Sequence, residues 1–258
     1  PETSEGTTFD EMGICRACRS SEHKMHINWV EREKRLRQIL EHYKSVSGDN
    51  YDCIVPISGG KDSVFQLHVL TKVYKMNPLA VTFSHNWFSK TGWENLWNMI
   101  EKMDVAHMMF TPSRSLVNRL AKKSLYTIGD ACWHCHAGVG AWPLKAAIMM
   151  KVPLMVWGES ICEAGNKASY ADNDWQPVKF DEEYYLKVSS KVRPEKMVDE
   201  NISMKDLYPF KLPDKDEVTE ANIEGIHLGD YMFWDGERQV EFIKKEYGWQ
   251  EDDVDGTY

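Results

Sequence analysis

Ser58-Gly59-Gly60-Lys61-Asp62-Ser63 is the stretch of sequence on which the fold depends. It follows residues 51–57 (YDCIVPI), an apolar run rich in β-branched side chains that predicts a buried parallel strand. It precedes residues 64–70 (VFQLHVL), in which apolar side chains recur at helical spacing. The two glycines therefore lie in a turn from strand to helix, where they allow a sharp bend and the close approach of a ligand.

The residues of this turn, which we call the glycine loop (58–63), suit an anionic ligand. Backbone amides at the start of the following helix point toward the loop, and the helix dipole favours negative charge there. Ser58 and Ser63 add hydroxyl donors, and Lys61 adds a cation for phosphate oxygens. The loop is not of the Walker A type, whose first glycine lies further from its Gly-Lys pair. A glycine turn without a ligand is the alternative interpretation.

Composition narrows the class of protein. With 258 residues the chain can bury a sizeable core, in one large domain or in a domain with an appendage. Its formal charge of -9 argues against a broad basic surface for nucleic acid. No apolar run approaches the roughly 20 residues of a membrane helix, and no signal peptide is visible. We therefore expect a cytoplasmic protein that does not bind membranes.

Apolar strand patterns alternate with helical patterns through the middle of the chain. Strands are predicted at 51–57, 79–83, 106–110 and 152–157, and helices at 28–45, 91–103, 112–126, 138–150 and 236–247. Such alternation predicts an α/β fold, with a doubly wound parallel sheet covered by helices on both faces. Residues 187–196 are charged and are expected to form a mobile loop, whereas 226–234 are apolar and aromatic. We divide the chain into a cysteine-containing metal-binding segment (1–27), a nucleotide-binding domain (28–165) and a C-terminal substrate or partner region (166–258).

Ligands of such sheets bind at the carboxyl ends of the strands. We therefore assign Phe83 and Gly158, which end two predicted strands, to the nucleotide site together with the glycine loop. Glu159 contacts substrate or metal, or else caps a helix. Asp62 and Asp130 are candidate ligands of Mg²⁺, which prefers few carboxylates combined with phosphate oxygens and water. Asp62 is the stronger candidate, because Asp130 alternatively caps the turn that follows it.

Four of the six cysteines form two C-x-x-C pairs, Cys15/Cys18 and Cys132/Cys135. Together they would supply the four thiolates that zinc binds in structural sites, and an iron–sulfur cluster is the alternative metal centre. A further pair upstream could instead complete the first site, or all four could be free thiols. Cys53 and Cys162 are interpreted as small buried apolar residues.

The glycine loop resembles the SGGxDS loop of the ATP pyrophosphatase (PP-loop) superfamily. Members of that superfamily cleave ATP between the α and β phosphates and adenylate a carbonyl oxygen. The resemblance implies that Ser58, Gly59, Gly60, Asp62 and Ser63 hold the pyrophosphate end of ATP.

A wider set of motifs resembles the N-acetyl sugar amidotransferase family, which serves the synthesis of lipopolysaccharide O-antigen and related bacterial surface glycans. The motifs are Gly13-x-Cys15-x-x-Cys18, Asn28-Trp29-x-x-Arg32-Glu33, residues 55–63, Thr91-x-x-x-Asn95-Leu96, Gly129-Asp130, Trp157-Gly158-Glu159 and residues 227–231. The resemblance implies that ATP adenylates the acetamido oxygen of a nucleotide sugar and that ammonia then displaces AMP, giving an acetamidino sugar. Ser58, Lys61, Asp62 and Glu159 are the implied catalytic residues.

The sequence contains no recognisable glutaminase nucleophile motif. The resemblance therefore implies that ammonia comes from a separate glutaminase subunit, with a cyclase-like barrel subunit as a possible further partner. One alternative is a PP-loop enzyme of tRNA thiolation, which also uses C-x-x-C pairs, although the acidic charge argues against nucleic-acid binding. A non-catalytic nucleotide-binding subunit of a glycan-assembly complex is the other alternative, and the intact glycine loop argues against it.

Overall fold

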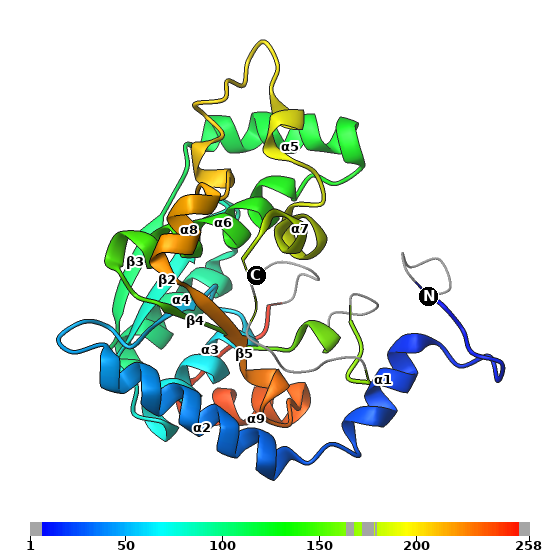
Figure 1. The fold of residues 1–258 in the computed structure, drawn as a ribbon. Coiled ribbons are helices and arrows are strands. Elements are labelled where there is room, and N and C mark those ends of the chain that lie inside the picture. The colour runs from blue at the N-terminus through cyan, green and yellow to red at the C-terminus, as the bar shows by residue number, and fades with distance from the viewer. Residues whose placement is uncertain (1–6, 164–167, 172–177, 179, 253–258) are drawn as a thin grey trace.

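A five-stranded parallel sheet forms the centre of the computed structural model, which describes residues 7–163, 168–171, 178 and 180–252 (Figure 1). The strand order is β3-β2-β1-β4-β5, and each neighbouring pair is parallel. The strands are β1 (Cys53–Pro56), β2 (Pro78–Phe83), β3 (Ala106–Phe110), β4 (Leu154–Trp157) and β5 (Glu224–His227). The predicted parallel α/β sheet is therefore confirmed.

Helices cover both faces of this sheet. Their bounds are α1 (Arg16–Lys24), α2 (Trp29–Val46), α3 (Lys61–His68), α4 (Lys90–Met103), α5 (Arg114–Ile128), α6 (Trp133–Met150), α7 (Glu182–Tyr185), α8 (Lys215–Ala221) and α9 (Gly236–Tyr247). A π-helical turn, Val69–Val73, continues α3. No helix among the described residues is both long enough and apolar enough to cross a membrane.

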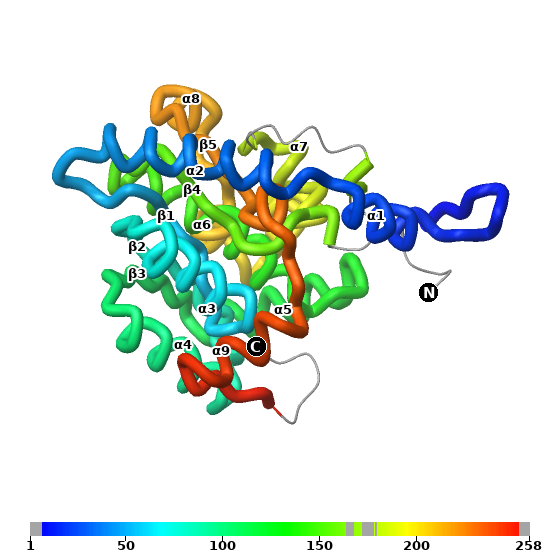
Figure 2. Tube along the Cα trace, turned by 90° about the horizontal axis from the view of Figure 1, so that it is seen from below, coloured from blue at the N-terminus to red at the C-terminus, as the bar shows by residue number. Residues whose placement is uncertain are grey.

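The sheet separates two apolar layers because side chains alternate between the faces of a strand. Cys53 and Val55 of β1 pack in one cluster with buried side chains of α2, α3, α4 and α9. Ile54, between them, packs on the opposite side with Leu144 and other side chains of α6. In Figure 1, α2, α3 and α9 accordingly lie below the sheet, and α5 to α8 lie above it. Figure 2 shows the lower layer from outside, with α2 crossing the view.

The fifth strand was not predicted from sequence. The segment 226–234 was recognised only as apolar and aromatic, whereas Glu224–His227 pairs with β4 in a register that places Trp157 beside His227. A strand of four residues that includes Gly225 has little strand signal of its own. Its conformation follows from pairing with β4, so part of the predicted C-terminal region completes the central sheet.

The structure differs from the sequence prediction at the start of α6 and in the segment 187–196. Helix α6 begins at Trp133 rather than at residue 138, because the buried Trp133 ring packs 5.8 Å from the ring of Phe210 and anchors the first turn. Residues 187–196, which were predicted to form a mobile loop, contain most of a π-helical turn that ends at Ser190 and most of a 3-10 helix at Pro194–Met197. Met197 is completely buried in the cluster beneath α6, which holds this segment in place.

Candidate functional site

The glycine loop joins the end of β1 to the start of α3, as predicted. Gly59 has a φ of +86°, in the region that side-chain-bearing residues rarely adopt. A Cβ atom added there would lie 2.9 Å from the carbonyl oxygen of Gly92 and 3.0 Å from the Cβ of Leu96. The loop therefore requires glycine at position 59 both for its backbone conformation and for its close packing against the start of α4.

Two serine hydroxyls shape the inside of the loop. The backbone N–H of Ser58 donates to Ser63 Oγ at 3.0 Å, and the two hydroxyl oxygens lie 3.1 Å apart. The N–H of Gly60 donates to Ser58 Oγ at 3.3 Å. Gly60 is the N-cap of α3 and has no side chain to occupy the amides of the first turn. The start of α3 thus combines amide donors and hydroxyls, which is the arrangement that binds phosphate.

Lys61 and Asp62 place opposite charges at the same turn. Lys61 Nζ lies 2.6 Å from Asp62 Oδ2, and both side chains are partly exposed, at 41% and 30%. The Nε1–H of Trp234 donates to Asp62 Oδ1 at 3.1 Å. A single partly exposed carboxylate beside a turn suited to phosphate fits Mg²⁺, which takes its other ligands from phosphates and water. Asp62 is therefore the residue that would hold the ion, which would neutralise phosphate charge.

Residues from the end of the chain hold this loop in position. Trp234 binds Asp62, and the Nε1–H of Trp249 donates to the carbonyl oxygen of Gly59 at 3.0 Å. Sequence reasoning missed both tryptophans, because no local motif surrounds them and the contacts span 172 and 190 positions. Trp234 ends the apolar and aromatic stretch 226–234, but that pattern does not indicate which atoms its ring contacts, and Trp249 lies outside the stretch.

The turn after β4 lies beside the same tryptophan. A Cβ atom on Gly158 would lie 2.9 Å from Gln66 Oε1 and 3.3 Å from the Trp234 ring, so position 158 has no room for a side chain. The Nε2–H of Gln66 donates to the carbonyl oxygen of Val156 at 2.8 Å and ties α3 to β4. Gly158, which was predicted to contact nucleotide, therefore packs against the Gln66 side chain of α3.

Glu159 has an exposed side chain, and its carbonyl oxygen accepts a hydrogen bond from His227 Nδ1 at 2.7 Å. The next residue caps the short helical turn that follows: Ser160 Oγ accepts from the N–H of Cys162 at 3.1 Å and bonds to Asp230. The capping alternative for Glu159 was therefore wrong. Its role toward substrate or metal stays a prediction.

The Phe83 side chain is part of the core. It is only 4% exposed, and a Cβ atom on Gly138 would lie 2.1 Å from its ring, so the ring packs tightly against α6. Its ring centroid also lies 5.5 Å from that of Phe210. Phe83 ends β2 as predicted, but its ring is buried in the core, and its assignment to the nucleotide site stays a prediction.

The two cysteine pairs begin two different helices. Cys15 is the N-cap of α1, with its Sγ accepting from the N–H of Cys18 at 3.4 Å. Cys132 is the N-cap of α6, and Cys135 lies in the first turn of that helix, where burial raises the pKa of its thiol to about 12. Within the described part of the chain, no three His, Cys, Asp or Glu side chains are grouped to hold a metal ion. The residues present do not fit the predicted four-thiolate zinc site or a cluster bound by the same thiols.

Asp130 caps the turn before α6. Its Oδ1 accepts from the N–H of Cys132 at 2.8 Å, and its Oδ2 lies 2.9 Å from Lys191 Nζ. Both oxygens of Asp62 are engaged as well, but Asp62 lies in the glycine loop, whereas Asp130 lies in the turn before α6. The capping interpretation of Asp130 is therefore the one that the structure favours over a role in binding Mg²⁺.

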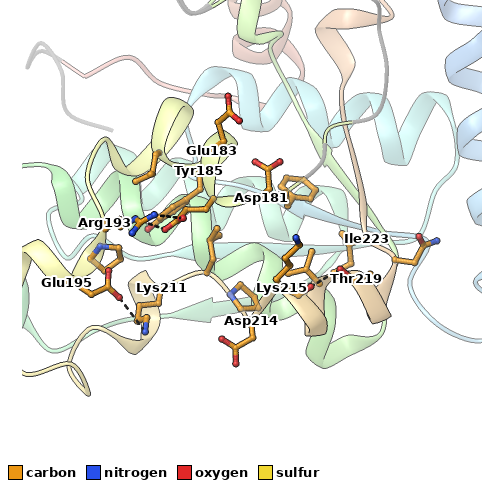
Figure 3. A pocket seen from close by; sticks show the side chains of 18 residues that line it. Asp181, Glu183, Tyr185, Arg193, Glu195, Lys211, Asp214, Lys215, Thr219 and Ile223 are labelled. Carbon is orange, nitrogen blue, oxygen red and sulfur yellow. Dashed lines mark hydrogen bonds and ion pairs between the residues drawn. The ribbon is translucent and has the colours of Figure 1, made fainter.

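Two of the cavities in the described part of the chain bear on the site. Figure 3 shows one of about 880 Å³ between α7, α8 and residues 193–195 and 211–215. Two ion pairs lie in its wall: Arg193 Nε lies 2.8 Å from Glu182 Oε1, and Lys211 Nζ lies 3.5 Å from Glu195 Oε1. No residue of the glycine loop lines it. The second, of about 850 Å³, is lined by Lys61 and by both tryptophans that hold the glycine loop.

The chain was compared with family models, with curated proteins and with solved structures. No family model matches it. The uncharacterized protein MJ1599 of Methanocaldococcus jannaschii is 32% identical over 108 residues, which cover 42% of this chain. The chain therefore spans only 38% of that relative's length.

Solved structures resemble the chain only distantly. A predicted subunit of tRNA methyltransferase from Methanocaldococcus jannaschii has 16% identity and a TM-score of 0.37, over 74% of this chain and 72% of its own. NMN synthetase from Francisella tularensis has 12% identity and a TM-score of 0.40, over 90% and 100%. The NH3-dependent NAD synthetase from Campylobacter jejuni has 12% identity and a TM-score of 0.41, over 89% and 100%. Similarity at this level assigns neither a family nor an activity to the chain.

Proposed function

We propose that this protein is an ATP-dependent enzyme of the PP-loop type, which releases AMP and pyrophosphate and replaces the acetamido oxygen of a nucleotide-activated N-acetyl sugar with ammonia. The observation that carries the proposal is the glycine loop itself. It lies at the carboxyl end of the central strand β1 and opens onto the uncapped first turn of α3. That edge is where parallel α/β sheets bind their ligands.

The loop supplies what the departing pyrophosphate needs. The amides at the start of α3, the hydroxyls of Ser58 and Ser63 and the ammonium group of Lys61 would contact the β and γ phosphates. These groups are already held in place, so they stabilise the charge that develops as pyrophosphate leaves without a reorganisation at that moment. Mg²⁺ held by Asp62 would add a further positive charge at the same phosphates.

The proposed reaction has two steps, adenylation of the acetamido oxygen and displacement of AMP by ammonia. The acetamido oxygen attacks the α phosphorus of ATP, and the bond between that phosphorus and the bridging oxygen breaks, which releases pyrophosphate and leaves an imidoyl adenylate. Ammonia then adds to the imidoyl carbon, loses a proton, and expels AMP together with the former acetamido oxygen. Adenylation is needed because an unmodified amide oxygen is a poor leaving group. We assign Glu159, exposed at the exit of β4, to contact with the sugar substrate.

Ammonia supply is proposed to come from a separate glutaminase subunit, with a barrel subunit as a further partner. A glutaminase nucleophile must be exposed beside a base, whereas the two cysteines outside the C-x-x-C pairs, Cys53 and Cys162, are buried, as predicted, with exposures of 0% and 6%. Alone, the chain is therefore expected to use ammonium and not glutamine, with a rate that rises toward alkaline pH as more NH₃ forms. Hydrolysis of glutamine by the purified chain at the rate of AMP release would contradict this division of labour.

An oxygen-labelling experiment tests the proposed reaction. The chain is incubated with Mg²⁺, ATP, ammonium and UDP-N-acetyl sugars that carry ¹⁸O in the acetamido group. The masses of the products are then measured by mass spectrometry. The expected result is ¹⁸O in AMP and a sugar in which oxygen has been replaced by NH. Label that stays in the sugar, or AMP release that depends on tRNA instead of a sugar, would overturn the proposed substrate.

A further inference from the structure

A groove of about 850 Å³ opens directly beside the glycine loop. Lys61 lines it from the loop, Lys24 from α1, Phe233 and Trp234 from the segment after β5, and Trp249 from the end of α9. Its volume lies within the range of small-molecule sites. Because Lys61 belongs both to the groove and to the first turn of α3, a molecule in the groove would lie next to phosphates held by the loop.

Aromatic rings form one wall of this groove. The Phe233 side chain is 40% exposed, and Lys24 Nζ lies 4.7 Å from the centre of its ring. Lys24 is itself held by a hydrogen bond of 2.6 Å to the carbonyl oxygen of Trp234. Trp249 is held by its bond to the Gly59 carbonyl. The wall therefore combines the partly exposed rings of Phe233 and Trp249 with an ammonium group held against the first of them.

Carboxylates line the groove from α9. Glu237 and Glu241 lie one turn apart on that helix, with exposed side chains for which the described residues provide no hydrogen-bond or ion-pair partner. The other two carboxylates of the groove have partners: Asp235 caps α9 through the N–H of Arg238, and Glu251 pairs with Lys244 at 2.8 Å. Glu237 and Glu241 are thus available to accept hydrogen bonds from a ligand.

We propose that this groove binds the sugar ring of the substrate that the glycine loop activates, an inference that rests on the proposed function. The C–H face of a pyranose carries slight positive charge and an apolar surface, which suits the faces of Phe233 and Trp249. The hydroxyl groups around the ring donate to Glu237 and Glu241. Four carboxylates against two lysines make the groove unsuitable for the backbone of a nucleic acid.

Paired variants test the groove apart from the loop. The variants Phe233→Ala and Glu237→Gln/Glu241→Gln are compared with the surface controls Tyr126→Ala on α5 and Glu220→Gln on α8, which lie outside the groove. Three quantities are measured for each protein: the Kd for Mg·ATP by calorimetry, the KM for UDP-N-acetylglucosamine in AMP release, and saturation-transfer NMR from the protein to the sugar protons of that compound.

The expected result is a rise of about tenfold in the sugar KM for each groove variant, with the Kd for ATP unchanged and saturation transfer to the sugar protons reduced. The controls should match the wild type. ATP binding with a sugar KM that the groove variants leave unchanged would overturn the groove assignment and leave the proposed function standing. A wild-type chain that does not bind ATP would overturn the proposed function, and with it this inference.

Discussion

Helices α3 and α6 begin in the same unusual way, and their surroundings show why only one suits a phosphate. At the starts of α2, α4, α5 and α9, a side chain accepts a hydrogen bond from a first-turn amide, whereas the N-caps of α3 and α6 make no such bond. Both starts therefore leave amide donors without a side-chain cap. The absence of a cap alone does not distinguish a ligand site.

The difference lies in the neighbouring groups. At α3, Gly60 leaves space, and the Ser58 and Ser63 hydroxyls add donors for an anion. At α6, Asp130 places its own carboxylate on the amide of Cys132, and the next turn buries His134. A second anion at α6 would meet the negative charge of the Asp130 carboxylate, which lies directly beside the helix start. The first start is open to a phosphate, and the second is closed by the protein itself.

The sharpest test compares the acidic residues at the two starts. Asp62→Asn is expected to lower sugar-dependent AMP release by about 10²–10³-fold, because it removes the charge that would hold Mg²⁺ at the phosphates. Asp130→Asn is expected to leave the rate unchanged, since Asp130 serves a local cap and an ion pair. Ser58→Ala should behave like Asp62→Asn. Circular dichroism of each variant checks the fold, and equal losses in Asp62→Asn and Asp130→Asn would refute the distinction.

Two glycines with positive φ, each just before one of these helices, allow a second comparison. Gly129 (φ +71°) has no atom within 4 Å of an added Cβ, so Gly129→Ala should lose only about 1–2 kcal/mol of unfolding free energy from backbone strain. Gly59→Ala adds a collision with the Gly92 carbonyl oxygen. We expect a larger loss of stability and the loss of ATP binding. Urea unfolding and calorimetry measure both quantities, and similar results for the two variants would contradict the packing described.

The buried His134 of α6 should make the free energy of unfolding depend on pH. Burial lowers the pKa of His134 from 6.5 to about 4. The folded state therefore stays neutral where the unfolded state takes up a proton, so stability is complete above pH 6.5 and falls toward pH 4. This loss amounts to roughly 3 kcal/mol of unfolding free energy. His134→Phe keeps a ring against Trp87, whose ring centroid lies 4.5 Å away, and should remove this part of the slope.

The control for that experiment is His26→Phe, at an exposed position. Denaturant unfolding at a series of pH values between 4 and 7 gives the free energy for each protein. The control should retain the wild-type dependence on pH. An identical slope in His134→Phe and the wild type would show that His134 is not the group responsible.

The smallest expected effect concerns the tryptophan that holds the glycine loop. Trp249→Phe keeps an aromatic ring but removes the hydrogen bond to the Gly59 carbonyl. The loss of one such bond costs about 1 kcal/mol, so we expect the affinity for ATP to fall roughly fivefold. Trp97→Phe, at a half-exposed position on α4, serves as the control. Calorimetric titration with Mg·ATP compares them. An affinity for ATP that falls equally in both variants would argue against a specific role of Trp249.

Local patterns predicted the central part of the fold well. The alternation of apolar and helical stretches indicated β1 to β4, and the start of α2 was predicted from Asn28, whose side chain indeed accepts from the N–H of Glu31. These features depend on neighbours in sequence, which the sequence displays directly. The two C-x-x-C pairs were a less reliable guide, since their spacing alone does not show whether four thiols meet. In the described structure they begin separate helices.

The sequence by itself determined the strand, glycine loop and helix that make the candidate phosphate site, because each depends on the conformational preferences of adjacent residues. Only the tertiary structure decided that β5 completes the sheet, that the Phe83 ring is buried, and that Trp234 and Trp249 hold the loop. These features arise from contacts between distant segments. Pairing, burial and hydrogen bonding across the fold settle them, and no local preference records which distant partner a residue will meet.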